Sequence, residues 1–455
     1  MAELRSESHW RRALRAFMRH RLALVGGGIL LVFYLTAAFA GFFSVYDPNF
    51  YTLSPSYRYA PPTRIYFRDP ETGRLTRPFV YRVKRELDLE TFTDRYVEDR
   101  SKRYPIYFFV RTPSQPYTVF KLFKGDLRLL GLGEKATEEG ARLYLIGADA
   151  FGRDLYSRIV YGGQVSLTIG IFSVFLATLL GLLLGGLAGY FQGTRVPLSR
   201  PLFSGWSGGF GPFRLFGLVL SLGFWLGLSY LFVQGLRVLF VDQAPSFGGV
   251  LLGLFFAAGL VFSLAAALFL EVRVDPDDVV MRLIEIIAAI PGLFLLVTLR
   301  SAFPVSMDPL KTFYMVVAIL AFIGWGGLAR TVRGMVLSIR EMDYVTAAKA
   351  LGVSELAIIT KHVLPATASY VIVAVTLGIP GFILAESGLS FLGLGITEPY
   401  TSWGLLLQAA QDGGFASFAD RPWVLVPGFM IFLAVLAWNF VGDGLRDALD
   451  PRRRR

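Results

Sequence analysis

The stretch Thr346-Ala-Ala-Lys-Ala-Leu-Gly-Val-Ser-Glu-Leu-Ala-Ile-Ile-Thr-Lys-His-Val-Leu-Pro365 lies in a short basic loop between two apolar segments. Its first part is rich in alanine, the residue with the highest helix propensity, and predicts a helix over residues 341–351. Gly352 follows at the place where a C′ residue with positive φ would end that helix. The loop is too short to be a domain, but two small helices broken at Gly352 can protrude from a membrane as a rigid docking element.

The second half of the loop predicts another short helix, over residues 355–363. Ser354 precedes it and is a good N-cap residue, because its hydroxyl can accept a hydrogen bond from the first turn. Pro365 suits the first turn of the next apolar segment, where its missing N–H is not needed. Small side chains at Ala347 and Ala348 would leave one face flat enough to fit a groove. A plain linker is the alternative, but a linker does not need two capped helices.

The composition excludes an ordinary soluble domain. The chain has 455 residues, of which 54% are hydrophobic and 17% charged, and its mean hydropathy is +0.52. The apolar residues cluster in eight segments, each close to the roughly 20 residues that a helix needs to cross a bilayer. These segments are Leu22–Phe43, Val165–Tyr190, Leu215–Gly235, Phe247–Leu270, Val279–Leu299, Phe313–Ala329, Ala366–Ala385 and Trp423–Gly442. Backbone groups in lipid must be satisfied internally, so the sequence predicts an all-α polytopic membrane protein of about eight transmembrane helices.

The net charge of +11 is placed as topology anchors rather than as a nucleic-acid patch. Basic residues gather before the first segment, after the last one and in the loop at 330–365: Arg5, Arg11, Arg12, Arg15, Arg19, Arg21, Arg330, Arg333, Arg340, Lys349, Lys361, Arg446 and Arg452–Arg455. The loops at 236–246 and 301–312 hold one basic residue each. The positive-inside rule therefore predicts that both termini and the loop at 330–365 are cytoplasmic. The first segment is too long for a cleaved signal peptide, which is the alternative.

A polar stretch, residues 44–163, follows the first segment and is predicted to be external. Three parts of it are rich in Tyr, Phe, Val and Ile and predict strands: Arg103–Arg111, Tyr117–Lys124 and Ala141–Ala148. Mixed charges along Lys84–Lys102 are typical of a solvated surface. A small β-containing external domain is expected, and it could be either a passive cap or a docking or gating surface.

Other segments predict a connector, a packed loop and two hinges. Residues 191–214 are rich in Gly, Pro and Ser, which is typical of a flexible connector, and the final external loop at 387–422 is expected to pack on neighbouring helices. Pro291-Gly292 and Pro380-Gly381 lie inside apolar segments. Each proline removes one helical hydrogen bond and is expected to kink its helix, which makes a hinge or a static packing feature.

Several kinds of catalytic chemistry have no counterpart in the sequence. No G-x-x-x-x-G-K-[ST] motif is present, so the chain is not expected to bind ATP in that mode. Its three histidines are far apart and it has no cysteine, which leaves neither a zinc motif nor disulfides. Glu285 and Glu386 are the acidic residues near membrane depth, and both lie near segment ends. A hydrogen-bonded role at a helix end is expected for each carboxylate. A proton relay is the alternative, because a charge buried in a membrane usually persists for function.

The loop resembles that of the permease subunits of ATP-binding-cassette importers, specifically the dipeptide and oligopeptide group. That family's pattern is E-A-A, three residues, G, nine residues, I-x-L-P, and this chain has Thr346-Ala347-Ala348, Gly352 and His362-Val363-Leu364-Pro365. Thr346 replaces the acidic residue and His362 the isoleucine. Both departures are similar to the peptide-permease variant of the motif.

Two further stretches are similar to that family. One leads into the second apolar segment and contains Gly147-Ala-Asp149, Gly152-Arg153-Asp154, Ser157-Arg158, Tyr161-Gly162 and Ser166-Leu167, with Tyr144-Leu145 in place of the usual His-Pro. The other is the closing signature from Asn439 to Arg452. The resemblance covers about residues 1–45, 145–190 and 275–452. The enlarged external stretch and residues 191–275 lie outside the usual pattern of six helices.

The resemblance implies a type I importer permease with a core of six helices plus an extra helical hairpin, in a bacterial inner membrane. It implies these parts: residues 1–43 as cytoplasmic N-terminus and first helix, 44–163 as external domain, 164–190 as a membrane helix, 191–275 as connector and extra hairpin, 276–443 as core helices with the coupling loop at 330–365, and 444–455 as a basic cytoplasmic tail. Thr346, Ala347, Ala348 and Gly352 would dock an ATPase, and Leu364 and Pro365 would link the loop to the next helix.

The implied assembly holds a second permease subunit, two cytoplasmic ATP-binding subunits and an external solute-binding protein, in contact with membrane lipid and without nucleic acid. ATP and Mg²⁺ would bind the ATPases, and this chain would carry neither cofactor nor catalytic residue. Peptides are the favoured cargo, but related permeases move oligosaccharides or nickel chelates. An ion-coupled secondary transporter and a membrane-anchored receptor or scaffold remain the alternatives from other classes.

Overall fold

The computed structural model describes residues 9–50, 57–69, 73–87, 94–119, 123–199, 257–259, 261, 272–304, 307–411 and 419–450. The predicted membrane segment Leu215–Gly235 lies outside the described residues, as does almost all of Phe247–Leu270. The chain divides into two compact units, which are described separately. One consists of Met1–Gly181, Ala288–Leu328 and Ala366–Arg455, and the other of Leu182–Ile287 and Ala329–Pro365.

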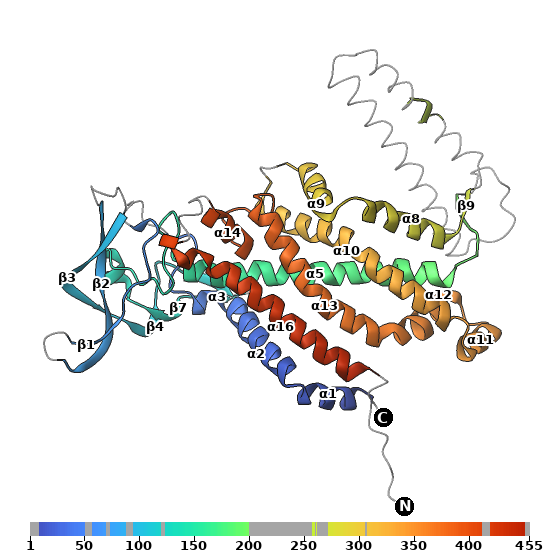
Figure 1. Cartoon of the computed structure of the whole chain (residues 1–455), viewed down its shortest axis with the longest axis horizontal. Helices are drawn as coiled ribbons and strands as arrows, with labels where there is room; N and C mark the ends of the chain where they lie inside the picture. The colour runs from blue at the N-terminus through green and yellow to red at the C-terminus, as the bar shows by residue number, and fades with distance from the viewer. Residues whose placement is uncertain are drawn as a thin grey trace, which may run out of the picture. The chain divides into compact units, whose positions relative to one another are not determined.

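Long apolar helices dominate the described part of the chain (Figure 1). Five of them are long and apolar enough to cross a membrane, and a bent pair of helices makes a sixth candidate. The spans are Arg21–Ala38 (α2), Leu155–Tyr190 (α5), the pair Pro276–Ala289 (α8) and Gly292–Ser301 (α9), Pro309–Ile339 (α10), Glu355–Phe391 and Pro422–Leu449. The last two contain α13, Ala368–Phe391, and α16, Val426–Leu449. These six candidates match the six predicted segments that fall on described residues, and they confirm a polytopic membrane protein.

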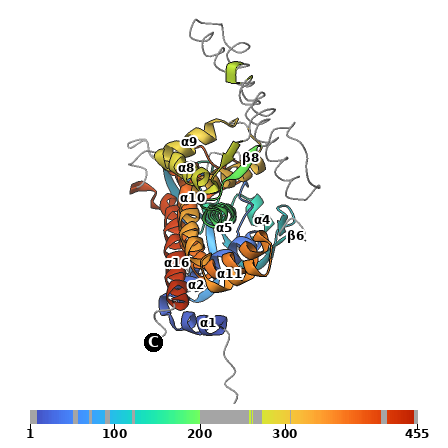
Figure 2. The same ribbon diagram turned by 90° about the vertical axis from the view of Figure 1, so that its right-hand side faces the viewer.

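In the first unit, α2 packs closely along α16 (Figures 1 and 2). Small residues allow this approach: a Cβ on Gly26 would lie 2.6 Å from the carbonyl oxygen of Ala437, and one on Gly444 would lie 2.3 Å from Cβ of Ala23. Helices in lipid gain stability from such close backbone contact, because lipid provides no hydrophobic drive between them. The basic helix α1, His9–Arg19, precedes α2 and also contacts α16.

The same unit holds small antiparallel sheets, beyond the end of α2 where the short helix α3, Ala40–Phe43, lies (Figure 1). A three-stranded sheet has the order β1-β2-β3, with β1 at Tyr66–Arg68, β2 at Leu75–Leu87 and β3 at Asp94–Pro105. Two-stranded sheets pair β4, Tyr107–Arg111, with β7, Leu127–Gly131, and β5, Tyr117–Val119, with β6, Phe123–Gly125. The predicted strand regions at 103–111 and 117–124 are therefore confirmed.

The predicted strand Ala141–Ala148 is wrong. This segment is irregular apart from an isolated bridge between Ala148 and Asp154. Leu143 and Tyr144 are buried, and their N–H groups bond the Tyr46 hydroxyl and the Thr63 Oγ1. The segment is apolar because it fills the core beside the small sheets, where Ala141 and Leu143 pack with Val80. The long charged strands β2 and β3 escaped prediction because solvent-facing charges mask their alternation.

The second unit contains the end of α5, most of α8, the last part of α10 and the loop that follows. It also contains two strands, β8 at Val196–Ser199 and β9 at Val272–Val274, which pair antiparallel. This pairing brings together the residues on either side of 200–271. α5 begins at Leu155 rather than at residue 164, so the first helical turns lie within the segment that the sequence assigned to the external domain.

The two proline sites behave differently. At Pro291 the helix breaks: α8 ends at Ala289, α9 begins at Gly292, and the two are bent by 94°. The bend is therefore much larger than a kink. Its cause is Pro291, which takes an extended ψ of 130° at the N-cap of α9. At Pro380 the helix α13 continues through the proline and Gly381.

Candidate coupling loop and ion network

The first helix of the loop, α11, ends in a Schellman motif at Gly352. α11 covers Asp343–Ala350, and Gly352 has φ +75°. The Val353 N–H donates to the Ala348 carbonyl at 3.1 Å, and the Gly352 N–H donates to the Lys349 carbonyl at 2.9 Å. This is the hydrogen-bond pattern that a C′ glycine provides. The predicted break at Gly352 is confirmed.

The second helix does not end where the sequence predicts. α12, Glu355–Ile358, passes into a π-helical turn at Ile359–Val363, then a 3₁₀ turn at Leu364–Thr367, and then α13. Ser354 occupies the N-cap position with extended φ and ψ, but its side chain makes no capping hydrogen bond. Leu364 and Pro365 lie in the 3₁₀ turn. The loop is thereby continuous with a membrane helix, and π turns of this kind are frequent at functional sites.

The loop exposes several apolar side chains among its charged ones. Leu351, beside the α11 terminus, is 83% exposed, and Met342, Tyr344 and Leu356 are also exposed. Thr346 and Ala347 are exposed, whereas Ala348 is buried. The flat face expected from the two alanines therefore belongs to Thr346 and Ala347, and Ala348 packs inward. An exposed apolar patch on a rigid element is the usual mark of a protein contact.

Arg340 fixes the base of the loop to the end of α5. Its Nη1 donates to the carbonyl oxygens of Gly189, Tyr190 and Gln192 at 3.1, 3.2 and 3.3 Å. The last carbonyls of a helix have no intrahelical donor, and a cation beside them also interacts favourably with the helix dipole. Arg340 follows directly after α10, so it joins the ends of two membrane helices at the point where the loop begins.

Tyr190 makes a second link between α5 and the loop. Its hydroxyl donates to the Glu355 carboxylate, in the first turn of α12. Lys349 of α11 lies over the same ring, with Nζ 5.0 Å from the centroid. The end of α5 is thus held by both small helices of the loop.

The helices below the loop approach each other closely. A Cβ on Gly185 would lie 2.4 Å from the Ala329 carbonyl oxygen, and one on Gly189 would lie 2.7 Å from that of Arg333. Arg333 also forms a two-bond ion pair with the buried Asp277, whose Oδ2 lies 2.5 Å from Nη2. α5, α8 and α10 are therefore tied together near the loop.

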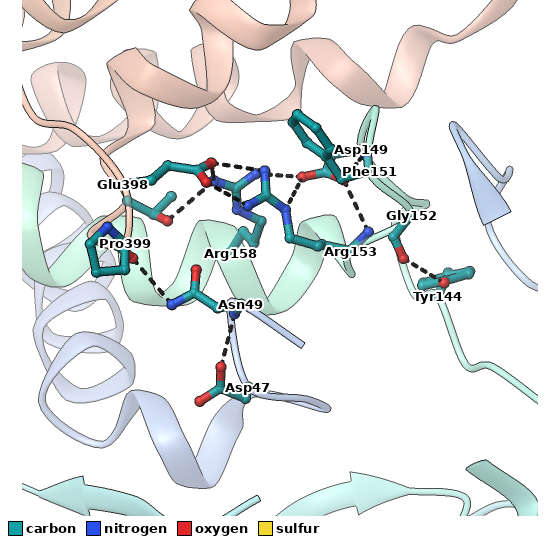
Figure 3. A network of polar contacts seen from close by, with 11 residues as sticks. Asp47, Asn49, Tyr144, Asp149, Phe151, Gly152, Arg153, Arg158, Glu398 and Pro399 are labelled. Carbon is teal, nitrogen blue, oxygen red and sulfur yellow. Dashed lines mark hydrogen bonds and ion pairs between the residues drawn. The ribbon is translucent and has the colours of Figure 1, made fainter. Parts of the chain in front are cut away.

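A second cluster, the ion network, lies in the other unit and is formed by Asp149, Arg153, Arg158 and Glu398 (Figure 3). Arg153 Nε lies 2.8 Å from Oδ2 of Asp149, and its Nη1 donates to Glu398 Oε2 at 2.9 Å. Arg158 pairs with the same two carboxylates. Asp149, Arg153 and Arg158 are buried and Glu398 is half-exposed, so two cations and two anions balance within one network.

Hydrogen bonds extend this network to both sides. The Asn49 Nδ2 donates to the Pro399 carbonyl oxygen at 3.3 Å, and the Tyr144 hydroxyl donates to that of Gly152 at 2.8 Å (Figure 3). The residues come from the segment after α3, the turn before α5 and the loop before α14, Trp403–Gln411. The network therefore joins three segments that are far apart in sequence.

The network shifts the pKa of its exposed member. Partial burial of Glu398 favours its neutral form, but the guanidinium groups of Arg153 and Arg158 outweigh this and hold the pKa of the carboxyl below its ordinary value. The neighbouring Asp154 is different. Burial raises the pKa of Asp154 to about 7, against the hydrogen bonds that it accepts from Ser157. Its Oδ1 has no hydrogen-bond partner in the part of the chain that the structure describes.

The two acidic residues near membrane depth have different surroundings. Glu386 is fully buried in α13, where Ser166 and Ser390 donate to its two carboxylate oxygens at 2.9 and 2.7 Å. Glu285 is exposed on α8 and pairs with Arg282 at 2.7 Å. Within the described ranges, no group of three or more His, Asp or Glu side chains is placed to hold a metal ion. The hydrogen bonds expected for Glu386 are therefore present, and its role stays a prediction.

Sequence reasoning missed the residues that brace both sites. Arg340, Tyr190 and Glu355 carry no motif of their own. Asp149, Arg153 and Arg158 belong to a quoted stretch, but that stretch gave no partner for them. A signal was available: buried arginines at the start of an apolar helix require carboxylates, and Glu398 is an acidic residue in the facing external loop.

These features define an integral-membrane transport subunit, and the similarities to known proteins give its family. Residues 249–455 match the binding-protein-dependent transport system inner membrane component family, and residues 8–62 match the N-terminal TM domain of oligopeptide transport permease C. The chain belongs to the binding-protein-dependent transport system inner membrane component family, and it is a multi-pass, non-catalytic component of the inner membrane.

Three curated relatives illustrate the range of this family. The chain is 30% identical to the oligopeptide transport system permease protein OppC of Haemophilus influenzae over 319 residues, which cover 70% of this chain and 73% of the relative. It is 32% identical to the dipeptide transport system permease protein DppC of Bacillus subtilis over 311 residues, or 68% and 69%. It is 27% identical to the glutathione transport system permease protein GsiD of Pectobacterium atrosepticum over 320 residues, or 70% and 76%.

Proposed function

We propose that this chain is a translocation subunit of an importer for dipeptides or oligopeptides, driven by ATPase subunits that grip its cytoplasmic loop. The observation that carries the proposal is the construction of the loop. Exposed apolar residues, with Leu351 foremost, lie on a short helix that Arg340 and Glu355 brace against the end of α5. A partner that displaces this surface acts on α5 directly and on α13 through a continuous helix.

The proposed assembly has four further subunits: a second permease, two ATPases and an external solute-binding protein. ATP and Mg²⁺ bind the ATPases in this scheme. Binding of ATP changes the contacts at the loop, and the differential contacts shift the helices between inward-facing and outward-facing states. Thr346, Ala347, Leu351 and Gly352 supply the docking surface and its geometry, while Leu364 and Pro365 join it to α13.

The topology that goes with this function has both termini and the loop at 330–365 in the cytoplasm. The external domain, expected at 44–163, is shortened to 44–154 because α5 begins at Leu155. Residues 191–275 supply a connector and an extra hairpin beside the six-helix core, which gives eight spans in all. The clustered arginines before α2 and after α16 support this orientation. Pro291 and Gly292 are proposed as the hinge between α8 and α9, and Pro380 and Gly381 as a second point of bending in α13.

Co-purification and transport test the function together. A tagged chain, expressed with its natural partners and extracted in mild detergent, is expected to bring down ATPase subunits that mass spectrometry identifies. The reconstituted complex should take up a labelled peptide only with ATP and the binding protein. Uptake of an oligosaccharide or a nickel chelate, with no uptake of peptides, would show that the importer carries a different cargo. Uptake by the chain alone that a protonophore abolishes would support a secondary transporter instead.

A further inference from the structure

Strand β4 carries exposed aromatic side chains in the middle of the external domain's sequence. Phe108 and Phe109 are 61% and 62% exposed, and Tyr107 is exposed as well. The next residue, Val110, is buried. Contiguous apolar surface of this kind marks contact with a partner or a membrane. The question is which of these covers β4.

The position of β4 relative to the first membrane helix answers this question. β4 pairs with β7, and Arg128 of β7 is fully buried against the end of α3. Its Nη1 donates to the Gly41 carbonyl at 3.2 Å and to the Ser44 Oγ at 2.5 Å. The strand pair is therefore fixed at the point where the first membrane helix ends.

The aromatic surface of β4 continues an exposed apolar stripe of that helix. Leu31, Leu35 and Phe39 are exposed at intervals of four residues, so they lie along one face of the first span and its end. Beyond Phe39, the ring of Phe42 lies 6.3 Å from the ring of Phe109, between centroids. An apolar surface thus runs from the membrane span onto the strand without a polar interruption among these residues.

The backbone of β4 is strained in a way that favours this exposure. Phe109 has φ +54°, a left-handed conformation that a bulky side chain rarely adopts. In a regular strand Phe108 and Phe109 would point to opposite faces of the sheet. Here both remain exposed beside the helix end, and strain that a fold retains points to a use for the residue.

Cationic groups lie beside the aromatic residues. The Arg77 guanidinium carbon lies 4.0 Å from the centre of the Tyr107 ring, and Arg111 at the end of β4 is exposed. Aromatic residues and arginines are the side chains enriched where a membrane protein meets lipid headgroups. We propose that β4 inserts Phe108 and Phe109 into the headgroup region of the bilayer and so fixes the external domain to the membrane surface.

A nitroxide scan tests this proposal directly, because the chain has no cysteine and needs no background removal. Phe108→Cys and Phe109→Cys are spin-labelled in the full chain, in nanodiscs of phosphatidylethanolamine and phosphatidylglycerol. Both labels are expected to collide more with oxygen than with a water-soluble nickel chelate. Leu31→Cys in α2 gives the lipid reference, and Leu75→Cys in β2, at an 80% exposed position, gives the aqueous reference.

Labels at both positions that match the Leu75→Cys reference would overturn the proposal and leave the surface for a protein partner. A second measurement needs no substitution. The unmodified chain is photolysed in nanodiscs that contain a phosphatidylethanolamine with a diazirine near the carbonyl end of its acyl chain. Mass spectrometry should find lipid adducts on residues 107–111. Adducts on α2 without any on this strand would contradict lipid contact, even if a cysteine variant fails to fold.

Discussion

Arg158 and Glu398 are 240 positions apart in the chain, yet Nη2 of Arg158 lies 2.9 Å from Oε1 of Glu398. Arg158 is 1% exposed, so its charge has left water and depends on the carboxylates around it. This contact ties the start of α5 to the loop before α14. The two segments are therefore coupled by charge as well as by apolar packing, since Leu155, Ile159 and Trp403 share one buried core cluster.

Removal of the buried cation should be costly. Arg158→Met leaves Asp149 buried without one of its partners, and loss of one member of a buried pair costs about 3–5 kcal/mol. The matched control is Arg100→Met, because Arg100 forms an exposed ion pair with Glu98 at 3.5 Å. That change should cost less than about 1 kcal/mol. Denaturant unfolding of the purified proteins in detergent measures both, and equal losses would contradict the role of the network.

The stability of the external domain should fall as the pH rises from about 4 to about 7. The pKa of Asp154 is about 7 in the folded protein, above its unfolded value, so the folded state holds the proton more tightly in this range. The neutral form therefore stabilises the fold at low pH, and that contribution, up to about 4 kcal/mol, is lost as the pH passes through the folded pKa.

Asp154→Asn provides the test of this pH dependence. The amide keeps an oxygen to accept the Ser157 hydrogen bonds but cannot ionise. Apparent melting temperatures between pH 5 and 8 should decline for the natural protein more steeply than for the variant. Parallel curves for the two proteins would show that Asp154 does not titrate in this range.

The tip of the loop should contribute to ATPase binding without contributing to folding. Leu351→Glu places a charge on an 83% exposed apolar residue, so the melting temperature should not change. If Leu351 is central to the contact, the amount of co-purified ATPase should fall about tenfold or more. Leu75→Glu, at another exposed leucine on β2, is the control and should leave ATPase recovery unchanged.

The glycine at the α11 terminus should be required for coupling. Gly352→Val places a β-branched side chain at φ +75°, where L-residues pay about 1–2 kcal/mol, although a Cβ there meets no neighbouring atom. The expected result is normal membrane insertion with reduced peptide uptake per ATP hydrolysed. Gly352→Asn should retain most coupling because asparagine tolerates this conformation. Ala348→Arg, at a buried position, should instead destabilise the loop itself.

The Tyr190 hydroxyl should affect coupling more than stability. Tyr190→Phe removes its hydrogen bond to Glu355 and keeps the ring under Lys349, so the loss of stability should be about 1 kcal/mol. The ratio of transport to ATP hydrolysis in the reconstituted complex should fall. Tyr314→Phe, at an exposed position on α10, is the control. An unchanged ratio in the Tyr190 variant would mean that its hydroxyl is not needed for coupling.

The sequence predicted the features that depend on local chemistry. The break at Gly352 follows from the conformation that glycine allows, and the membrane spans follow from the length of apolar segments. It did not predict contacts between distant segments, such as Arg340 with the end of α5 or Arg158 with Glu398. It also misread Ala141–Ala148, because burial in a core and burial in a strand select the same apolar residues.

The backbone contact between α5 and α10 at Gly185 and Gly189 restricts how this part of the molecule can deform. With no side chain between them, the two helices have no intervening layer that could shear or repack. A displacement of Arg340 should therefore move α5 and α10 together. In the proposed importer, an ATPase would therefore move two helices as one stiff unit, because Gly185 and Gly189 lack the methyl groups that would hold α5 and α10 apart.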